Sequence, residues 1–354
     1  MKILSVVGAR PQFIKLALLS KELRKNFDEV IVHTGQHYDV GMSDIFFSQL
    51  SIPKPEYNLG IEEKDEVKQV TKMMIGLEKV MKKEKPDLVL LIGDTNSTLA
   101  AALTASRLNL TCAHLESGTR TFDKSIPEEI NRIVADNVSD ILFCPSKTAV
   151  ENLKKEGFNN GLHNTGDIMI DLLLGSVKDA ENKSDVLSRF SLEKKRYILA
   201  TVHRQVNTND KDNISSIFNA LIEGGEKTVV PLHPRTRKFL VKYGLYYEIK
   251  SKLKIIEPLN YIDLLALEKN AKKIITDSGG MQKEAYTLKV PCITLDRNTG
   301  WVETVDDGWN VLVGAKKENI INAIKNFIPT GKQHNHYGNG DATEKIVNIL
   351  KELK

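Results

Sequence analysis

Three carboxylates of the sequence stand where acid and base chemistry could take place. Asp94 and Glu116 each follow an apolar run typical of a buried strand, and Glu128 stands at the start of a helical pattern. Parallel strands end at one edge of a sheet, so these side chains can converge. Carboxylates held close together raise one another's pKa, as general acids and bases require. Two simpler interpretations compete. Asp94 could cap the next helix, and Glu128 with Glu129 could form an ordinary acidic first turn, a role that we expect one of the two to fill.

The segment TDSGGMQKE, residues 276–284, has the composition of a phosphate-binding turn between a strand and a helix. Gly279 and Gly280 let the backbone approach a ligand closely, and N–H groups at a helix N-terminus attract phosphate oxygens. The competing interpretation is an ordinary helix cap by Ser278. Glu284 lies further along the same helix, where it could accept a hydrogen bond from a ribose hydroxyl. The fingerprints GxGxxG and GxxxxGK[ST] are absent, which disfavours NAD and P-loop chemistry, and we expect no cofactor.

Several basic residues also lie in loops that follow predicted strands. His203 and Arg204 follow the first strand of the second half, and a phosphate or proton-transfer role is favoured over a purely structural one. Further candidates for substrate binding in such loops are Arg10, Lys15 and His233. His334 and His336 could bind metal in isolation, but we expect no carboxylate or cysteine partner nearby, so no metal site is predicted.

Short apolar runs alternate with helical periodicity from the first residues onward, which favours βαβ units and a doubly wound α/β sheet. The runs are apolar throughout, as expected of parallel strands covered on both faces. In the first half, strands are predicted at 3–7, 29–33, 88–92, 111–115 and 141–144, and helices at 11–23, 98–108 and 128–138. In the second half, strands are predicted at 197–202, 228–232, 253–256, 273–276 and 291–295.

A polar, turn-rich stretch around residues 175–195 is the predicted domain boundary. It divides the chain into an N-terminal Rossmann-like domain, residues 1–175, and a C-terminal one, residues 190–340. The last predicted helix, within residues 342–354, is expected to pack back on the first domain. The two domains are expected to face a cleft, where loops from the carboxyl ends of both sheets would meet a ligand.

The bulk composition argues against several other classes of protein. The chain has 354 residues, 41% of them hydrophobic and 27% charged, with a formal net charge of +4, as is normal for a soluble two-domain enzyme. Its lysines are not interleaved with aromatics, so no nucleic-acid partner is expected. The N-terminal apolar run is too short for a signal peptide and no stretch approaches a membrane span, so we expect a cytoplasmic protein without a membrane partner. Cys112, Cys144 and Cys292 lack CxxC spacing and are predicted to be buried thiols.

Taken together, the strand-end loops resemble the non-hydrolysing UDP-N-acetylglucosamine 2-epimerase family. The motifs that carry this resemblance run in order along nearly the whole chain: GARPQFIK, HTGQHYD, GDTNST, HLESGTR, PEEINR, VHR, HPRTR, TDSGGMQKEA and WVETVDDGWNVLVG. The resemblance implies a GT-B-like architecture of two Rossmann-like domains, with the nucleotide bound mainly by the C-terminal one. It also implies a UDP-sugar substrate, a homodimer and no need for NAD.

The implied reaction is reversible inversion at carbon 2 of a UDP-2-acetamido sugar. That hydrogen is not activated by a carbonyl, so the family eliminates UDP to give a 2-acetamidoglycal and then adds it back. By matching motifs, the resemblance assigns acid and base roles to Asp94, Glu116 and Glu128, and places His203 near the departing diphosphate. It assigns phosphate binding to Arg10, Ser278, Gly279 and Gly280, and ribose binding to Glu284. Glu129 and Asp123 are then expected to be capping or loop-anchoring charges. Which carboxylate acts as the base stays open.

The substrate within this family also stays open. UDP-N-acetylglucosamine, converted to UDP-N-acetylmannosamine for surface polysaccharide synthesis, is the first expectation. The motifs GARPQFIK, HTGQHYD, MSDIFF and WVET resemble the branch that acts on UDP-2,3-diacetamido-2,3-dideoxyglucuronate at least as much, and a GT-B glycosyltransferase is a further alternative. Three positions depart from the family pattern and bear on nucleotide affinity and sugar specificity: Val206, the reversed pair Asp296-Arg297, and Gly300.

Overall fold

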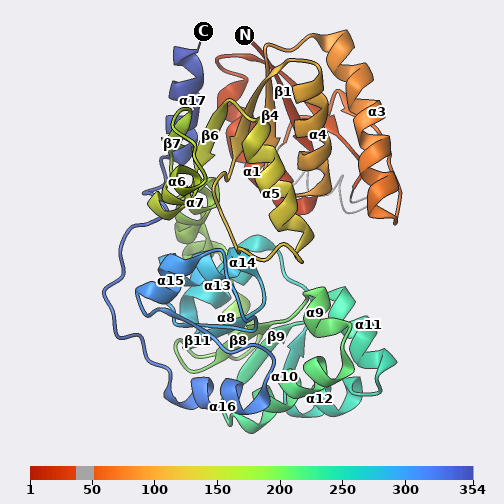
Figure 1. The fold of residues 1–354 in the computed structure, drawn as a ribbon. Helices are drawn as coiled ribbons and strands as arrows, with labels where there is room; N and C mark the ends of the chain where they lie inside the picture. Colours follow the sequence, from red (N-terminus) through yellow and green to blue (C-terminus); the bar gives the residue numbers. More distant parts are fainter. Residues whose placement is uncertain (37–51, 354) are drawn as a thin grey trace. The chain divides into compact units, whose positions relative to one another are not determined.

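The protein is described here by a computed structural model that covers residues 1–36 and 52–353; part of the HTGQHYD motif and all of MSDIFF lie outside these residues. The chain forms two compact units. Unit 1 comprises Met1–Leu172 and His336–Lys354, and unit 2 comprises Leu173–Asn335. Figure 1 labels the elements of both units.

Unit 1 is built on a parallel sheet with the strand order β3-β2-β1-β4-β5-β6-β7. Its strands are β1 (Lys2–Val7), β2 (Asp28–His33), β3 (Tyr57–Asn58), β4 (Leu88–Ile92), β5 (Thr111–Leu115), β6 (Ile141–Cys144) and β7 (Leu162–Asn164). The order reverses between β1 and β4, which makes the carboxyl ends of these two strands the place where a doubly wound sheet binds ligands. All five residues of β4 are buried, because helices cover the sheet on both faces.

The helices of unit 1 fall into two layers (Figure 1). They are α1 (Arg10–Leu23), α3 (Glu66–Glu84), α4 (Asn96–Arg107), α5 (Pro127–Val138), α6 (Lys147–Lys155) and α17 (Ala342–Glu352). Leu88, Leu90 and Ile92 of β4 pack with α1 and α17, whereas Val89 and Leu91 pack with α3, α4 and α5. This alternation follows from the two-residue period of a strand.

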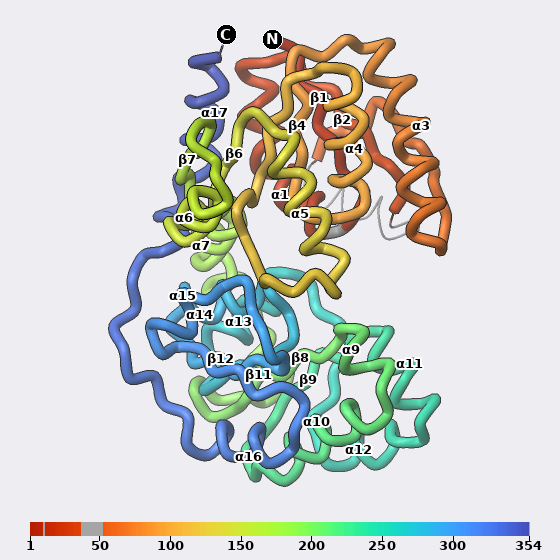
Figure 2. Tube along the Cα trace, viewed as in Figure 1, coloured from red at the N-terminus to blue at the C-terminus, as the bar shows by residue number. Residues whose placement is uncertain are grey.

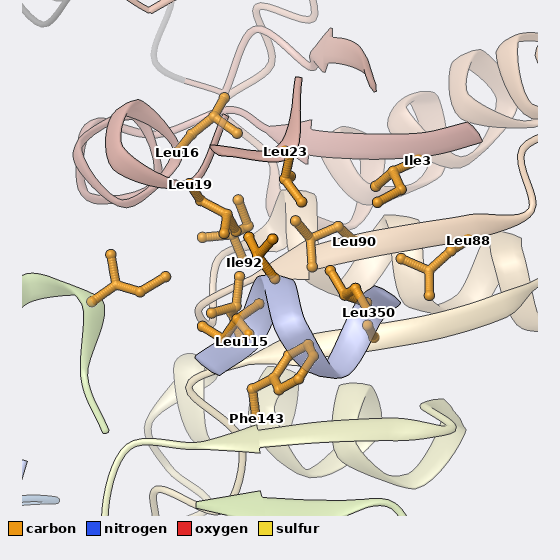
Figure 3. Packing of buried hydrophobic residues seen from close by; sticks show 14 of the residues in the cluster. Ile3, Leu16, Leu19, Leu23, Leu88, Leu90, Ile92, Leu115, Phe143 and Leu350 are labelled. Carbon is orange, nitrogen blue, oxygen red and sulfur yellow. The ribbon is translucent and has the colours of Figure 1, made fainter. Parts of the chain in front are cut away.

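Helix α17 completes the core of unit 1 although it follows unit 2 in the sequence. Figure 2 traces the chain from α16 (Lys317–Asn326) through an extended segment to α17. Figure 3 shows Leu350 of α17 among Leu88, Leu90 and Phe143, and all four belong to one buried cluster. The last helix, which was predicted to pack back on the first domain, is therefore held against the first sheet by the burial of its hydrophobic side chains.

Unit 2 contains a second parallel sheet, with the order β10-β9-β8-β11-β12-β13. Its strands are β8 (Ile198–Thr201), β9 (Thr228–Pro231), β10 (Lys254–Ile256), β11 (Lys273–Thr276), β12 (Cys292–Thr294) and β13 (Asn310–Leu312). Its other helices are α8 (Val186–Arg189), α9 (Gln205–Thr208), α10 (Lys211–Glu223), α11 (Pro234–Lys242), α12 (Tyr246–Lys252), α13 (Tyr261–Asn270), α14 (Gly279–Thr287) and α15 (Val302–Asp306). The order of this sheet reverses between β8 and β11, as in a Rossmann-like fold.

The predicted α/β class with doubly wound parallel sheets is confirmed. One local interpretation differs, because the polar stretch around 175–195 is largely helical: α7 (Ile168–Lys183) runs through its first half. Burial of one helix face allowed polar residues to be helical there. The three cysteines are free and buried, as predicted, and burial raises the pKa of each to about 12. No helix in the described part of the chain is long and apolar enough to cross a membrane.

Candidate active site

The carboxyl ends of β4 and β5 lie side by side and bring Glu116 next to Gly93. Ile92 pairs with Leu115 in the sheet, and the Gly93 amide donates to the Leu115 carbonyl at 3.1 Å. Glu116 has a φ of +73°, a left-handed conformation that residues with a Cβ rarely adopt. A Cβ built on Gly93 would stand 3.8 Å from Glu116 Oε2. The strand-end loops that the sequence analysis singled out therefore meet in unit 1.

Lys15 of α1 forms an ion pair with Glu116. The two side chains are only 11% and 18% exposed, so water screens the pair weakly. A pocket of unit 1 is lined by this pair and by residues at the ends of β6 and β7, among them Phe143, Gly166 and Asp167. The structure thus brings a predicted binding residue, Lys15, against a predicted catalytic residue at a pocket.

Asp94 is held by α5, the helix that follows β5. Its carboxylate accepts a hydrogen bond from Arg132 Nη1 at 2.6 Å, and its carbonyl accepts one from Asn131 Nδ2 at 2.9 Å. The Asp94 side chain remains 37% exposed and can still meet a ligand. The alternative in which Asp94 caps the next helix does not hold, because the Thr95 hydroxyl caps α4. Asp94 and Glu116 are each paired with a cation. From the sequence we expected only that the carboxylates would lie close to one another, and no cation was included.

Glu128 and Glu129 have different environments although they are adjacent in α5. Glu129 is buried and accepts hydrogen bonds from the Thr121 and Phe122 amides and from Arg132. Burial acts to raise the pKa of Glu129, but these hydrogen bonds and the Arg132 charge outweigh burial and hold the pKa below its usual value. Glu128 is exposed, and its carboxylate accepts no hydrogen bond from residues 1–36 or 52–353. Glu129 therefore anchors the preceding loop, and Glu128 points its carboxylate outward.

Asp123 also anchors this loop. Its carboxylate accepts hydrogen bonds from the Ser125 amide at 2.9 Å and from the Ser125 hydroxyl at 2.6 Å, and these hydrogen bonds lower its pKa. The expectation that Asp123 and Glu129 are structural charges is confirmed by these contacts.

A buried network lies directly behind Glu116 and Asp94. His114 Nδ1 lies 2.7 Å from Asp136, and its Nε2 lies 2.8 Å from the Gly93 carbonyl oxygen. Arg120 forms an ion pair with the other oxygen of Asp136 at 2.7 Å. Burial acts to raise the pKa of Asp136, but the hydrogen bond with His114 and the charges of His114 and Arg120 lower it. The network fixes the turn that carries both carboxylates, because it ties β5, α5 and the Gly93 loop together.

Arg10 is the first residue of α1, and its side chain is outside the part of the chain that the structure describes. The backbone beside it is well defined by hydrogen bonds. The amides of Gly8 and Ala9 both donate to Gln12 Oε1, at 2.8 and 2.9 Å. A Cβ at Gly8 would stand 2.1 Å from the Thr34 hydroxyl oxygen, so only glycine fits at this strand end.

The corresponding strand ends of unit 2 are organised by Asp277, at the end of β11. Its buried carboxylate accepts hydrogen bonds from the His203 amide at 3.0 Å, the Arg204 amide at 2.9 Å and Asn207 Nδ2 at 3.0 Å. His203 Nδ1 lies 3.5 Å from the same carboxylate. The loop after β8 is therefore fastened to the loop after β11, and His203 is held at this edge of the sheet.

The DSGG turn forms the N-terminus of α14 as predicted. Ser278 caps the helix by accepting from the Met281 amide at 3.5 Å, so the capping interpretation is also correct. A Cβ on Gly279 would lie 3.1 Å from Trp301 Nε1 and 3.9 Å from Arg204 Nη2. Donor groups therefore surround this helix N-terminus. Asp296, one of the positions that depart from the family pattern, forms an ion pair with Arg204.

The remaining predicted residues of unit 2 also lie at this edge of the sheet. Glu284 is largely buried and accepts a hydrogen bond from the Tyr261 hydroxyl at 3.2 Å. His233 caps α11, and its Nδ1 accepts from the Arg235 amide at 3.1 Å. The rings of His203 and His233 lie 5.4 Å apart. The loops after β8, β9 and β11 thus gather His203, His233 and the DSGG turn.

The expectation that His334 has no carboxylate nearby is wrong. Its Nδ1 lies 3.0 Å from Asp307, and its backbone amide donates to the same carboxylate at 3.0 Å. The two residues are 27 positions apart, so no local sequence pattern could indicate this contact.

The profile of the family described as "UDP-N-acetylglucosamine 2-epimerase" matches residues 21–351. The chain belongs to this family. Its members are isomerases, so the predicted family, fold class and enzyme class are confirmed.

Relatives of the family match over their full length. A "UDP-N-acetylglucosamine 2-epimerase homolog" of Methanococcus maripaludis is 54% identical over 100% of both chains. A "UDP-2,3-diacetamido-2,3-dideoxy-D-glucuronate 2-epimerase" of Pseudomonas aeruginosa is 44% identical, again over 100% of both chains. The crystal structure of the Methanocaldococcus jannaschii UDP-GlcNAc 2-epimerase with UDP-GlcNAc and UDP has a TM-score of 0.91 at 43% identity, covering 99% of this chain and 100% of that one.

Some residues that organise this site were not singled out from the sequence. Arg132 stands three residues after Glu129 in a helical pattern, a spacing that puts both on one face and could have identified the pair. Neither Asp136 nor Asp277 stands at a sequence spacing that would identify its partner. Asp136 meets His114 across 22 positions and Asp277 meets His203 across 74, so these contacts depend on the order of the strands.

Proposed function

We propose that this protein catalyses the reversible 2-epimerisation of a UDP-2-acetamido sugar by eliminating UDP and adding it back. The full-length similarity to family members named for this reaction carries the proposal. The carboxylates and cations at the strand ends of unit 1 support it, because the reaction needs both proton transfer and charge stabilisation.

In the forward direction a base removes the proton at carbon 2. The electron pair of the C–H bond forms the double bond between carbons 1 and 2, and the C–O bond at carbon 1 breaks so that UDP leaves with its electron pair. In the return step the glycal takes a proton on the opposite face and UDP attacks carbon 1. We assign the acid and base roles to Asp94, Glu116 and Glu128. Lys15 and Arg132, which pair with Glu116 and Asp94, supply positive charge beside these two carboxylates.

We assign nucleotide binding to unit 2. The backbone N–H groups of Ser278, Gly279 and Gly280 open α14, and a helix N-terminus of this kind attracts phosphate oxygens. His203 and His233 would stand near the diphosphate, and Glu284 would accept hydrogen bonds from the ribose. Arg10 is a further proposed phosphate ligand from unit 1. In this assignment residues 1–175 supply the acid and base groups and residues 190–340 hold UDP.

We propose UDP-N-acetylglucosamine as the substrate, with UDP-N-acetylmannosamine as the product and surface polysaccharide synthesis as its destination. The Methanocaldococcus jannaschii structure, which holds UDP-GlcNAc, supports this choice. A second candidate substrate is UDP-2,3-diacetamido-2,3-dideoxyglucuronate, which the name of the Pseudomonas aeruginosa relative favours. We further propose that the protein acts as a homodimer, which light scattering would test against the 39.7 kDa of one chain.

The test is incubation with each UDP-sugar in deuterium oxide, with NMR detection of product stereochemistry and of label at carbon 2. Epimerisation with deuterium at carbon 2 is expected for one of the two candidates. Epimerisation without label would refute elimination, and sugar transfer to an added acceptor would show a glycosyltransferase instead. Asp94→Asn is expected to lower turnover by about 100-fold or more. Asp179→Asn, which removes an exposed charge paired with Lys183, is the matched control and is expected to keep full turnover.

A further inference from the structure

Trp301 lies against the DSGG turn, and the proposed reaction gives it no role so far. It directly precedes α15 and is partly exposed. A Cβ built on Gly279, the first residue of α14, would stand only 3.1 Å from Trp301 Nε1, closer than side chains normally pack. Glycine at this position therefore lets the edge of the indole ring lie directly beside the N-terminus of α14.

The indole ring is held along one side of α14. Lys283 follows Gly279 by four residues in this helix, so the two lie on the same side, one turn apart. The Lys283 ammonium lies 3.6 Å from the centroid of the ring, and Lys283 is only 2% exposed. The Trp301 backbone is also fixed, because its amide donates to the Thr299 hydroxyl at 3.1 Å and its carbonyl accepts from the Thr304 hydroxyl at 2.7 Å.

The position of Lys283 decides which part of the indole ring meets a ligand at the turn. A cation that lies over an aromatic ring covers one of its faces, so a nucleotide base cannot stack on that face of Trp301. The edge that carries Nε1 is the part of the ring beside Gly279. An indole N–H donates hydrogen bonds and cannot accept them. Trp301 therefore offers a hydrogen-bond donor to the turn.

Donors of three kinds meet beside Gly279. The first turn of α14 carries backbone N–H groups, which a helix leaves without partners of its own. Trp301 Nε1 lies 3.1 Å, and Arg204 Nη2 3.9 Å, from the same Cβ position. A Cβ on Gly280 would have Ser278 Oγ, at 3.9 Å, as its nearest neighbour among the described residues not adjacent to it in the chain, so the turn has open space. Donors do not bind one another, and a group placed among them must be an acceptor, favourably an anion.

We propose that Trp301 is a further binding residue for the diphosphate of the nucleotide, and that its indole N–H donates to a phosphate oxygen at the DSGG turn. This inference rests on the proposed function, in which this turn binds UDP. The diphosphate gains negative charge when the C–O bond at carbon 1 breaks. A neutral donor fixed in place before that step stabilises the departing UDP without having to reorient.

The test compares the affinities of the full-length protein for UDP and for uridine, which lacks the phosphates. Trp301→Phe removes the indole N–H and keeps an aromatic face for Lys283. Its affinity for UDP, measured by calorimetry, should fall about tenfold or more, because a hydrogen bond to a charged group is lost, whereas its affinity for uridine should stay within about twofold. The matched control is Trp309→Phe. Trp309 donates through Nε1 to the Gly331 carbonyl at 3.1 Å, and its replacement should leave both affinities unchanged.

A spectroscopic signal reports the hydrogen bond itself. Trp301 and Trp309 are the 2 tryptophans of the chain, so a ¹⁵N–¹H correlation spectrum resolves their indole N–H signals, and Trp309→Phe assigns them. UDP should move the indole proton of Trp301 downfield, because the N–H then donates to an anion. Uridine should leave this proton in place.

Each contrary result has a distinct meaning. Failure of the wild-type protein to bind UDP would overturn the proposed function and this inference with it. Wild-type UDP affinity in Trp301→Phe, with no effect of UDP on the indole proton of Trp301, would overturn the inference alone. Equal losses of UDP and uridine affinity in Trp301→Phe would show that Trp301 contacts the nucleoside, and would refute its assignment to the diphosphate.

Discussion

Replacing Arg132 by leucine should destabilise unit 1 more than any exposed ion pair could. Arg132 donates to Glu129 through Nη2 at 2.6 Å and through Nε at 3.1 Å, and to Asp94 through Nη1 at 2.6 Å. Removing one partner of a buried ion pair costs about 3–5 kcal/mol, because the other charge is left without compensation. Glu129 would keep the donors of Thr121 and Phe122, so we expect the lower end, about 3 kcal/mol.

The contribution from Asp94 to this cost is small. Its side chain is 37% exposed, so water screens its contact with Arg132 and the loss there is at most about 1 kcal/mol. The total for Arg132→Leu is therefore about 3–4 kcal/mol, measured as the free energy of unfolding by urea denaturation. The matched control is Arg196→Leu. Arg196 pairs with Glu193 at the same three-residue spacing, but the side chains are 78% and 77% exposed, and about 0–0.5 kcal/mol is expected.

A second variant tests whether the stranded charge is the cause. Glu129→Gln added to Arg132→Leu should recover more than half of the loss, because the amide keeps most of the hydrogen bonds and carries no charge. Arg132→Lys should be intermediate, since lysine keeps the charge but cannot donate to both carboxylates through a planar fork. Equal costs for Arg132→Leu and Arg196→Leu, or no recovery in the double variant, would refute this reasoning.

Three further predictions concern the fold of unit 1. Gly118→Ala should cost about 3 kcal/mol or more in urea unfolding, because φ is +75° and a Cβ would stand 2.2 Å from a carbonyl oxygen in α6. Gly225→Ala has the same φ of +75° with nothing within 4 Å, so it should cost only about 1 kcal/mol, and equal costs would contradict the steric argument. Leu350→Ala should cost about 2–5 kcal/mol because the side chain is fully buried, and a cost below about 1 kcal/mol would show that α17 is dispensable to this core. Acidification should destabilise the protein, because folding lowers the pKa values of Glu129 and Asp136. The stability that these two carboxylates contribute is fully present above their unfolded-state pKa values of about 4. It is lost as the pH falls through their pKa values in the folded protein. Unfolding midpoints between neutral and acidic pH measure this loss, and Glu129→Gln should make them less sensitive to pH.

The sequence was sufficient to predict the central strands and the loops that follow them, but not the short strands β3, β7 and β13. Parallel strands covered on both faces are apolar throughout, so β4 and β5 could be located, and Asp94 and Glu116 with them. The cap of α14 by Ser278 could also be predicted, because capping depends on residues close in sequence.

The partners of these residues could not be predicted in the same way. Glu116 pairs with Lys15 across 101 positions, and that contact exists only because β1 and β5 flank β4 in the sheet. The left-handed backbone of Glu116 is imposed by the same surroundings and not by its own preference. The buried position of Glu268 was missed for a related reason: in a short helix such as α13, a single glutamate gives no periodic sign of facing the core.

The place of α17 also has a consequence for how the protein is made. On the ribosome, the first sheet emerges long before residues 342–352, because all of unit 2 is translated in between. Until then the faces of Leu88, Leu90 and Phe143 that Leu350 will cover are open to water. The nascent first unit must therefore wait in an incompletely buried state while the second one is synthesised, and is exposed to chaperones during that interval.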